Sequence, residues 1–337
     1  MSEVYEPPFH MTDEITNLVI EIGELVGRLT VDPTMSMSPK LRKENRIRSI
    51  YSSLAIEQNT LSLAQVTDVI EGRKVLGPPK DILEVRNALE AYEQLPSLNS
   101  GSVDDLLKAH LLMMRGLAAE AGQFRTGEVG VYSNHILIHK GAPAESVPQI
   151  TAQLFDWIRV SAVNPLIKSC IVHYEIEYIH PFMDGNGRIG RLWQLLILQE
   201  WKPVLAWLPV ETLIHERQAD YYQALNASDQ KGNSTPFVTF MLTVISGTLR
   251  DICNRQPLHV GTNVGIYGGT NDGKNEQDPA KTLLLILNQQ PNATARRLAE
   301  LMHLSQRQVE RILSALKQQG RIVRHGANKG GWWEVVK

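Results

Sequence analysis

Apolar residues recur at helical spacing along most of the chain. The segments EITNLVIEIGELVGRL (14–29) and RKENRIRSIYSSLAIEQ (42–58) place them at positions i, i+3, i+4 and i+7, the spacing of an amphipathic helix. Ser62 precedes a further short helical pattern, at the position of an N-cap. The pattern therefore predicts a largely helical body over residues 1–253. Other predicted helices lie near 81–95, 103–119, 146–162, 166–179, 187–201, 217–230 and 235–253.

The stretch between residues 122 and 142 lacks this spacing. It reads GQFRTGEVGVYSNHILIHKGA, with glycines, β-branched residues and a central Ser-Asn pair. Such a composition is typical of two short strands joined by a turn. One small β-hairpin is therefore expected within the helical body.

The pattern changes again after residue 253. Residues 254–280 are rich in Gly, Asn and Asp and predict a linker. Three helical patterns follow, the third with Ser305 as its N-cap and Gly320 as its stop. RIVRHGANKGGWWEVV then predicts two strands, with Trp332 and Trp333 on opposite faces, one of them in the core. This layout over 281–337 is typical of a winged helix-turn-helix domain.

Composition adds a location and a charge asymmetry to this outline. The 337 residues are 43% hydrophobic and 21% charged, with no run of eighteen apolar residues. The N-terminus lacks the features of a secretory signal, and Cys170 and Cys253 lack a metal-binding or redox spacing. We therefore expect a cytoplasmic protein without a membrane span. Residues 281–337 hold ten Lys/Arg and three Glu, about +7, which leaves about −9 for the rest.

The string IHPFMDGNGRIGR (179–191) holds the strongest candidate chemistry. It joins two helical patterns through a loop in which Gly185 and Gly187 let the backbone approach a ligand closely. The loop leads into a helix N-terminus, where N–H groups and the helix dipole favour an anion. Arg188 and Arg191 lie one turn apart on that helix, which suits a di- or triphosphate.

Two more side chains complete this candidate site. Asp184 offers carboxylate oxygens to the Mg²⁺ that accompanies such a phosphate. His180 has an ordinary pKa near neutrality, which suits a general base that removes a hydroxyl proton. Taken singly, a histidine at a helix end is usually a cap, and two arginines three residues apart usually form a solvated face. Their combination in thirteen residues favours a nucleotide site.

HPFMDGNGRIGR resembles the signature of the Fic-domain family, HPFx(D/E)GNGRxxR, and meets every fixed position. The hairpin stretch resembles the family's flap, although Tyr132 and Ser133 replace the usual Gly-His pair and Pro143 stands alone. DYYQALNASDQKGNSTPFVTFM (220–241) resembles the segment around the family's adenine pocket. The resemblance covers roughly residues 45–250.

The resemblance implies a mainly α protein, with the Fic helical fold and a small β-hairpin flap. Residues 1–110 would form an N-terminal helical region, and 111–253 the catalytic core. A linker over 254–280 would lead to the winged helix-turn-helix domain over 281–337, a frequent appendage in this family.

The resemblance also implies transfer of AMP from ATP to a Ser, Thr or Tyr hydroxyl of a target protein, with Mg²⁺ as the cofactor. The implied roles are these: His180 is the base, Asp184 holds Mg²⁺, Gly185, Asn186 and Gly187 form the anion hole, Arg188 stabilises phosphate charge, and Arg191 holds the γ-phosphate. Tyr222 and Asp229 would border the adenine. Val129, Gly130 and Val131 would form the flap edge, where a target segment adds as a strand.

A second motif, SSLAIEQN (52–59), resembles the family's inhibitory helix, (S/T)xxxE(G/N). Ser53 and Glu57 fit this pattern within the predicted helix 42–58. A carboxylate facing Arg191 would occupy the guanidinium meant for the γ-phosphate. Gln58 departs from the Gly or Asn of the pattern, and the following Asn59 is a substitute, so the end of the helix after Glu57 is an open point.

Several alternatives stay open at this stage. The Fic domain of a transcription regulator would only sense nucleotide, and a related enzyme would transfer UMP, phosphate or phosphocholine. Glu57 near the anion hole would also suit removal of AMP by water. The basic 281–337 segment would bind DNA through Gln306, Arg307, Gln308 and Arg311, with Arg324, His325 and Lys329 on the wing, or else dock a protein. A homodimer is a further possible assembly.

Overall fold

The computed structural model describes residues 5–31, 39–133, 136–255, 283, 284, 287, 293–302, 306–318, 321–325 and 332–335. The chain divides into two compact units, Met1–His259 and Val260–Lys337.

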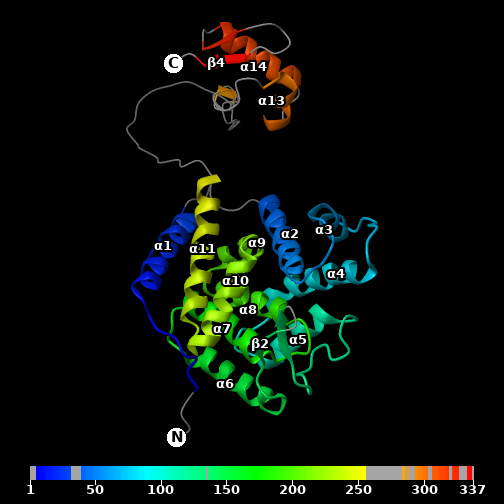
Figure 1. Cartoon of the computed structure of the whole chain (residues 1–337), viewed down its shortest axis with the longest axis vertical. Coiled ribbons are helices and arrows are strands. Elements are labelled where there is room, and N and C mark those ends of the chain that lie inside the picture. The colour runs from blue at the N-terminus through cyan, green and yellow to red at the C-terminus, as the bar shows by residue number, and fades with distance from the viewer. Residues whose placement is uncertain are drawn as a thin grey trace. The chain divides into compact units, whose positions relative to one another are not determined.

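Helices make up most of the first unit (Figure 1). They are α1 (Asp13–Val31), α2 (Pro39–Ile56), α3 (Leu63–Ile70), α4 (Pro79–Gln94), α5 (Val103–Met114), α6 (Val147–Val160), α7 (Pro165–Ile179), α8 (Asn186–Trp201), α9 (Val210–Glu216), α10 (Gln218–Lys231) and α11 (Thr235–Arg255). Within the described residues, short 3₁₀ segments lie at Leu95–Ser97, Ala144–Ser146 and Pro203–Trp207.

Helices α7 and α8 form the centre of this unit. They pack along each other, and their facing sides are almost completely buried. Trp193 of α8 is fully buried, and its indole N–H donates to the carbonyl of Ser100. Helix α11 lies beside α1 and also contacts α7 and α10 (Figure 1). The loop between α7 and α8, which carries the candidate motif, is therefore held between two buried helices.

Helix α2, which the sequence singles out as a candidate inhibitory helix, belongs to the same core. It packs against α9, α4 and α8. Ile47, Ile50, Leu54 and Ile56 on its buried side are each at most 7% exposed and join the core cluster of α7 and α8. The two compact units meet near residue 259, and the predicted boundary at residue 110 lies within α5; the division of the first unit into two regions stays a prediction.

Two helices differ from the sequence expectation. Helix α5 ends at Met114 rather than near 119, because Arg115 turns to an extended ψ of 123° and Gly116 has a φ of +73°. Helix α9, Val210–Glu216, was not predicted, since seven residues are too few for a clear period. Ser62 does cap α3, in a reciprocal arrangement with Gln65, as predicted.

The predicted hairpin is present as strands β1 (Gly130–Ser133) and β2 (Ile136–Lys140). They pair antiparallel with Gly130 opposite Lys140, and a bulge falls between Val131 and Tyr132. The N–H of Gly141 donates to the carbonyl of Val129 at 3.3 Å, which extends the pairing toward the loop. The body is thus mainly α with one small flap-like sheet.

Helix α11 is the one described helix that is long and apolar enough to span a membrane by length and composition. Its Thr235–Cys253 segment has a mean hydropathy of 1.2 and is 61% buried inside the unit. Phe237, Met241 and Ile245 are fully buried in the main core. This packing accounts for its apolar character as a core helix.

The second unit has its own hydrophobic core. Leu283, Leu287, Leu298, Val309 and Ile322 are fully or almost fully buried. Its described elements are α13 (Ala295–Met302), α14 (Gln306–Gln318), β3 (Ile322–His325) and β4 (Trp332–Val335), with the two strands antiparallel. Trp333 is 8% exposed and Trp332 43%, which confirms that one tryptophan is in the core. The winged-helix assignment stays a prediction, and Ser305, Gly320, Lys329 and residues 256–280 lie outside the described residues.

Candidate active site

His180 is the residue that ends α7. It adopts a left-handed conformation, with φ 54° and ψ 60°, and so turns the chain away from the helix axis. Its Nδ1 lies 3.2 Å from the carbonyl oxygen of Glu177. A carbonyl only accepts, so Nδ1 carries the proton in this contact and Nε2 holds the lone pair of the neutral ring. The ring is thereby set in the tautomer that a general base requires.

Arg125 fixes the backbone around His180. Its guanidinium is buried and donates from Nε to the carbonyl of His180 at 2.7 Å and from Nη1 to that of Gly127 at 2.8 Å. Nη2 donates to the carbonyls of Ala142 and Ile179. One side chain therefore joins the end of α7 to both ends of the hairpin. Arg125 lies in the stretch that resembles the family's flap, but its spacing gave no signal of this role.

The motif loop, residues 181–185, follows His180 and leads into α8. The side-chain amide of Asn186 binds across it: Oδ1 accepts from the N–H of Phe182 at 2.9 Å, and Nδ2 donates to its carbonyl at 2.8 Å. Gly185 has a φ of +88°, and a Cβ there would lie 2.7 Å from Sδ of Met114. The amide of Asn186 is thus hydrogen-bonded within the loop, so this residue offers an anion its backbone N–H rather than its side chain.

Helix α8 begins directly at the motif loop. Its first intrahelical hydrogen bond runs from the N–H of Ile189 to the carbonyl of Gly185, at 3.0 Å. The N–H groups of residues 186–188 therefore have no partner within the helix. With the helix dipole behind them, they have the geometry that anion binding requires, and the anion hole stays a prediction.

Asp184 and Arg188 form an ion pair beside this helix end. Oδ1 of Asp184 accepts from Nη2 of Arg188 at 3.0 Å and from the N–H of Gly185 at 2.6 Å. The Asp184 side chain is 56% exposed. One accessible carboxylate beside a phosphate site fits Mg²⁺, which takes most of its other ligands from phosphate and water. No cluster of three metal-ligating side chains occurs within the described residues.

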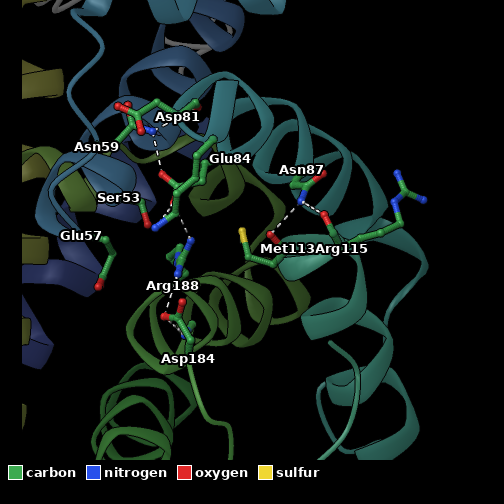
Figure 2. A network of polar contacts seen from close by, with 12 residues as sticks. Ser53, Glu57, Asn59, Asp81, Glu84, Asn87, Met113, Arg115, Asp184 and Arg188 are labelled. Carbon is green, nitrogen blue, oxygen red and sulfur yellow. Dashed lines mark hydrogen bonds and ion pairs between the residues drawn. The ribbon is translucent and has the colours of Figure 1, made fainter. Parts of the chain in front are cut away.

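Arg188 also faces Glu84 of α4, which the sequence did not indicate. Nη1 of Arg188 lies 3.6 Å from Oε1 of Glu84, while Oε2 of Glu84 accepts from Nδ2 of Asn59 at 2.8 Å. Figure 2 shows Glu84 between Asn59 and Arg188, with Asp184 on the other side of the guanidinium. The Arg188 side chain is 4% exposed, and Nε and Nη1 have no hydrogen-bond partner in the described part of the chain. Two buried donors therefore remain for a ligand.

Arg191 is the better satisfied of the two arginines. Its Nε donates to Oγ of Ser53 at 3.1 Å, and Nη2 donates to the Ser53 carbonyl at 3.0 Å and to Oε1 of Glu57 at 2.8 Å. Burial alone lowers the pKa of Arg191, but Glu57, Tyr221 and Glu177 outweigh it and raise that pKa above its usual value. The side chain is 2% exposed. The structure thus brings Ser53 and Glu57 onto Arg191.

The Glu57 carboxylate also covers the first turn of α8. A Cβ placed on Gly187 would lie 2.5 Å from Oε1 of Glu57 and 3.0 Å from Nη1 of Arg191. Helix α2 ends at Ile56, and Gln58 takes a φ of +66° that is unusual for a residue other than glycine. Gln58 therefore makes the turn expected of a Gly or Asn, which settles the open point about the helix end.

A buried polar chain lies behind Arg191. His173 contacts Oε1 of Gln194 through Nδ1 at 2.7 Å and the hydroxyl of Tyr221 through Nε2 at 3.1 Å. That hydroxyl also reaches Oε1 of Glu177, at 3.1 Å. Burial lowers the pKa of His173 to about 3, so the ring is neutral at neutral pH. This network of hydrogen bonds ends at Glu177, which the sequence did not indicate. Oε1 of Glu177 lies 3.3 Å from the position of a Cβ on Gly187.

The remaining predicted residues lie around the edge of this site. Tyr222 of α10 is 47% exposed; burial raises its pKa, a hydrogen bond with Gln218 opposes this, and the nearby Glu57 adds to the rise. Asp229, two turns further along α10, accepts from the hydroxyl of Tyr174 at 2.9 Å. Val129 and Gly130 are half-buried at the start of β1, and Val131 continues that strand. The assignment of these residues to adenine and target binding stays a prediction.

The chain matches the Fic/DOC family over residues 100–198. Its fold and sequence are also similar over almost their whole length to those of a solved Fic family protein from Desulfovibrio desulfuricans G20. The identity is 42%, the TM-score is 0.73, and the alignment covers 98% of each chain. The fold, the motif loop and this likeness together define the class: the chain belongs to the Fic family.

Curated relatives include a protein adenylyltransferase fic-1 from Caenorhabditis briggsae, 32% identical over 219 residues. A protein adenylyltransferase Fic from Nematostella vectensis is 32% identical over 242 residues. These alignments cover 60% and 68% of this chain. The chain spans about half the length of these relatives, 40% and 54%.

Proposed function

We propose that this chain is a protein adenylyltransferase, which transfers AMP from ATP to a Ser, Thr or Tyr hydroxyl of a target protein or of itself. The observation that carries the proposal is the pairing of His180, set with its lone pair on Nε2, with the amide-lined start of α8. The curated relatives bear the name of this activity. The names of these relatives support the class of reaction, and the geometry supports the proposed roles of the residues.

The side chains divide the reaction between them. Nε2 of His180 takes the proton of the target hydroxyl, whose oxygen then forms a bond to the α-phosphorus as the bond to pyrophosphate breaks. The N–H groups at residues 186–188 bind the non-bridging oxygens of that phosphate. Arg188 and Arg191 neutralise charge on the leaving pyrophosphate. Mg²⁺ held by Asp184 would supply further positive charge between the phosphates.

We also propose that Glu57 inhibits this reaction from within the chain. Its carboxylate pairs with Arg191 and lies over Gly187, so it competes with the γ-phosphate for the guanidinium. A charge-assisted hydrogen bond is worth roughly 1.5–3 kcal/mol. Since about 1.4 kcal/mol corresponds to a factor of ten in rate, removal of this contact raises activity about 10- to 100-fold.

Mass spectrometry after incubation with Mg·ATP tests the reaction and the inhibition together. We expect the Glu57→Gly protein to gain one AMP on itself far faster than the unchanged protein. The matched control is Glu44→Gly, the same substitution at an exposed position of α2, which leaves the rate unchanged. Equal rates for the unchanged and Glu57→Gly proteins would exclude the inhibitory role. Absence of any adduct in both would argue against adenylyl transfer.

The identity of the donor and of the base needs separate variants. In the Glu57→Gly background, His180→Ala abolishes transfer while calorimetry still detects Mg·ATP binding. Parallel incubations with UTP and CDP-choline test the two other donor classes, and a phosphate adduct from ATP would indicate kinase chemistry. A nucleotide sensor would bind Mg·ATP but yield no adduct with any donor.

Removal of AMP is the second candidate activity. Glu57 lies at the anion-binding end of α8, where its carboxylate can align a water for attack on the AMP phosphorus. The AMP-modified Glu57→Gly protein, supplied as substrate to the unchanged protein, tests this. If the adduct is lost only when the added protein carries Glu57, the reverse step is supported. A stable adduct argues against it.

We propose duplex DNA as the partner of the second unit. Residues 281–337 carry a charge of about +7, and Arg297, Arg311 and Lys317 are exposed on α13 and α14. His325 stacks on the partly exposed Trp332 at 4.5 Å. Binding of the full chain to duplex DNA that weakens steeply with salt, and that Arg311→Glu reduces, supports this partner. No binding at low salt would favour protein docking.

A further inference from the structure

Helix α5 places a buried histidine against the motif loop. His110 is 1% exposed, and no motif in the sequence marks it. Its Nδ1 accepts from the N–H of Gly122 at 2.9 Å. Its Nε2 lies 3.0 Å from the carbonyl oxygen of Asp184. The ring thus bridges the loop after α5 and the residue that pairs with Arg188.

The two neighbours of the ring fix its tautomer without ambiguity. A backbone N–H can only donate, so Nδ1 of His110 is unprotonated, and a carbonyl can only accept, so Nε2 carries the hydrogen. Burial lowers the pKa of this ring to about 4, despite the hydrogen bond to Asp184, so it is neutral at neutral pH. His110 is therefore a donor of fixed direction, aimed at one carbonyl of the motif loop.

Packing reinforces these two hydrogen bonds. The His110 ring stacks on Phe182 with 3.6 Å between centroids and 7° between planes. A Cβ on Gly185 would lie 3.4 Å from Nε2 of His110 and 2.7 Å from Sδ of Met114. The motif loop is thus contacted at three points: the Phe182 ring, the Asp184 carbonyl and the Gly185 backbone.

We propose that His110 is a positioning residue of the nucleotide site: by holding the carbonyl of Asp184 it sets the direction of the Asp184 carboxylate and of the N–H groups that follow. The inference rests on the proposed function, because it assigns that carboxylate to Mg·ATP. The backbone between Asp184 and α8 is short, so rotation of the Asp184 carbonyl would move both the carboxylate and the N–H of Gly185. Substitution of a residue that orients a metal ligand typically lowers metal affinity or activity 10- to 100-fold.

Three substitutions separate the hydrogen bond to Asp184 from packing. In His110→Gln, Nε2 of the amide takes the place of the ring Nε2 and keeps the bond to Asp184. In His110→Asn, Oδ1 takes the place of Nδ1 and keeps only the bond to Gly122. His110→Phe keeps the stack on Phe182 and loses both bonds. Lys108→Gln, at an exposed position of the same helix, is the control.

The readout is ATP affinity by calorimetry, in the Glu57→Gly background, with Mg²⁺ and with EDTA. We expect His110→Asn and His110→Phe to lose about tenfold of the Mg²⁺-dependent gain in affinity and to need more Mg²⁺ for half-maximal transfer. His110→Gln and Lys108→Gln keep most of that gain. Thermal unfolding, followed in parallel, identifies any variant whose loss reflects unfolding.

The outcomes that overturn the inference differ from those that overturn the function. Equal losses in His110→Gln and His110→Asn, or no loss in any of the three, would show that His110 only fills space. If the Glu57→Gly protein with His110 intact binds Mg·ATP but forms no AMP adduct, the proposed transfer fails. The binding comparison would then still decide the role of His110.

Discussion

At the residue scale, Arg191 pairs with a carboxylate in the structure, although the proposed function assigns it to a phosphate. In the structure its donors are taken by Ser53 and Glu57, and almost none of its surface is exposed. Under the proposed function, a nucleotide phosphate would have to replace the Glu57 carboxylate at this guanidinium. Arg188, by contrast, keeps two buried donors without a hydrogen-bond partner among the described residues. The two arginines of the motif thus differ in readiness for phosphate.

Ser53→Ala tests the Arg191 contact apart from charge. The substitution removes the hydroxyl that accepts from Nε of Arg191 and leaves a buried donor unsatisfied, a cost of roughly 1–3 kcal/mol. We expect lower stability in urea unfolding and, because Arg191 is less well held beside Glu57, a modest rise in AMP transfer. Ser97→Ala is the control, because it is the same substitution at an exposed position. Unchanged stability would place the hydroxyl outside the Arg191 network.

Glu175 provides a pH prediction at a single position. Burial raises its pKa from 4.5 to about 7, although the Tyr5 hydroxyl donates to Oε2 at 2.8 Å and opposes the shift. The folded-state pKa lies above the unfolded one, so stability present below pH 4.5 is lost as the pH rises toward 7. Glu175→Gln cannot ionise and keeps an acceptor for Tyr5. We expect its free energy of unfolding at pH 8 to be about 3 kcal/mol larger than that of the unchanged protein.

Denaturant unfolding at several pH values measures this difference. Below pH 4.5 the two proteins should have nearly equal free energies of unfolding, because both side chains are then neutral. Glu93→Gln, the same substitution at an exposed position of α4, serves as the control. A difference that does not change with pH would assign the effect to packing instead of ionisation.

At the scale of elements, helical spacing predicted most of the helices, since each buries one face on a common core. The failures have physical causes. The end of α5 depends on the backbone at Arg115 and Gly116, and α9 is too short to show a period. His180, Asp184, Arg188 and Arg191 were found because the motif is contiguous. Glu84, His110, Arg125 and Glu177 were missed because their partners lie on other elements, which only the fold brings near.

Gln58 tests the end of α2. It occupies a left-handed backbone conformation that costs a residue with a Cβ about 1–2 kcal/mol. Gln58→Gly should stabilise the first unit by about 1 kcal/mol and hold the turn after Glu57 more firmly, so basal AMP transfer falls. Gln58→Ala, which keeps the Cβ, is the matched control and should give no gain. A loss of stability in the glycine variant would mean that the glutamine side chain itself holds the turn.

At the scale of the whole molecule, two buried neutral histidines tie stability to pH. Burial lowers the pKa of His173 to about 3 and that of His110 to about 4, below the unfolded value of 6.5. The unfolded chain therefore binds more protons as the pH falls below 6.5, and the folded state loses stability down to about pH 3. His173→Asn keeps a donor toward Gln194 but cannot protonate. Its unfolding free energy should depend less on pH between 6.5 and 3, which denaturant curves measure against His10→Asn on the surface.

The packing of α2 also limits how the proposed inhibition by Glu57 could be relieved. Ile47, Ile50, Leu54 and Ile56 are locked in the central core, and exposing each would cost roughly 1.5–3 kcal/mol. Peeling the helix away is therefore far more expensive than turning one carboxylate aside. If Glu57 inhibits the reaction as proposed, an activator does not need to displace a segment; it needs only to offer Glu57 a better cation, or Arg191 a better anion, at the last turn.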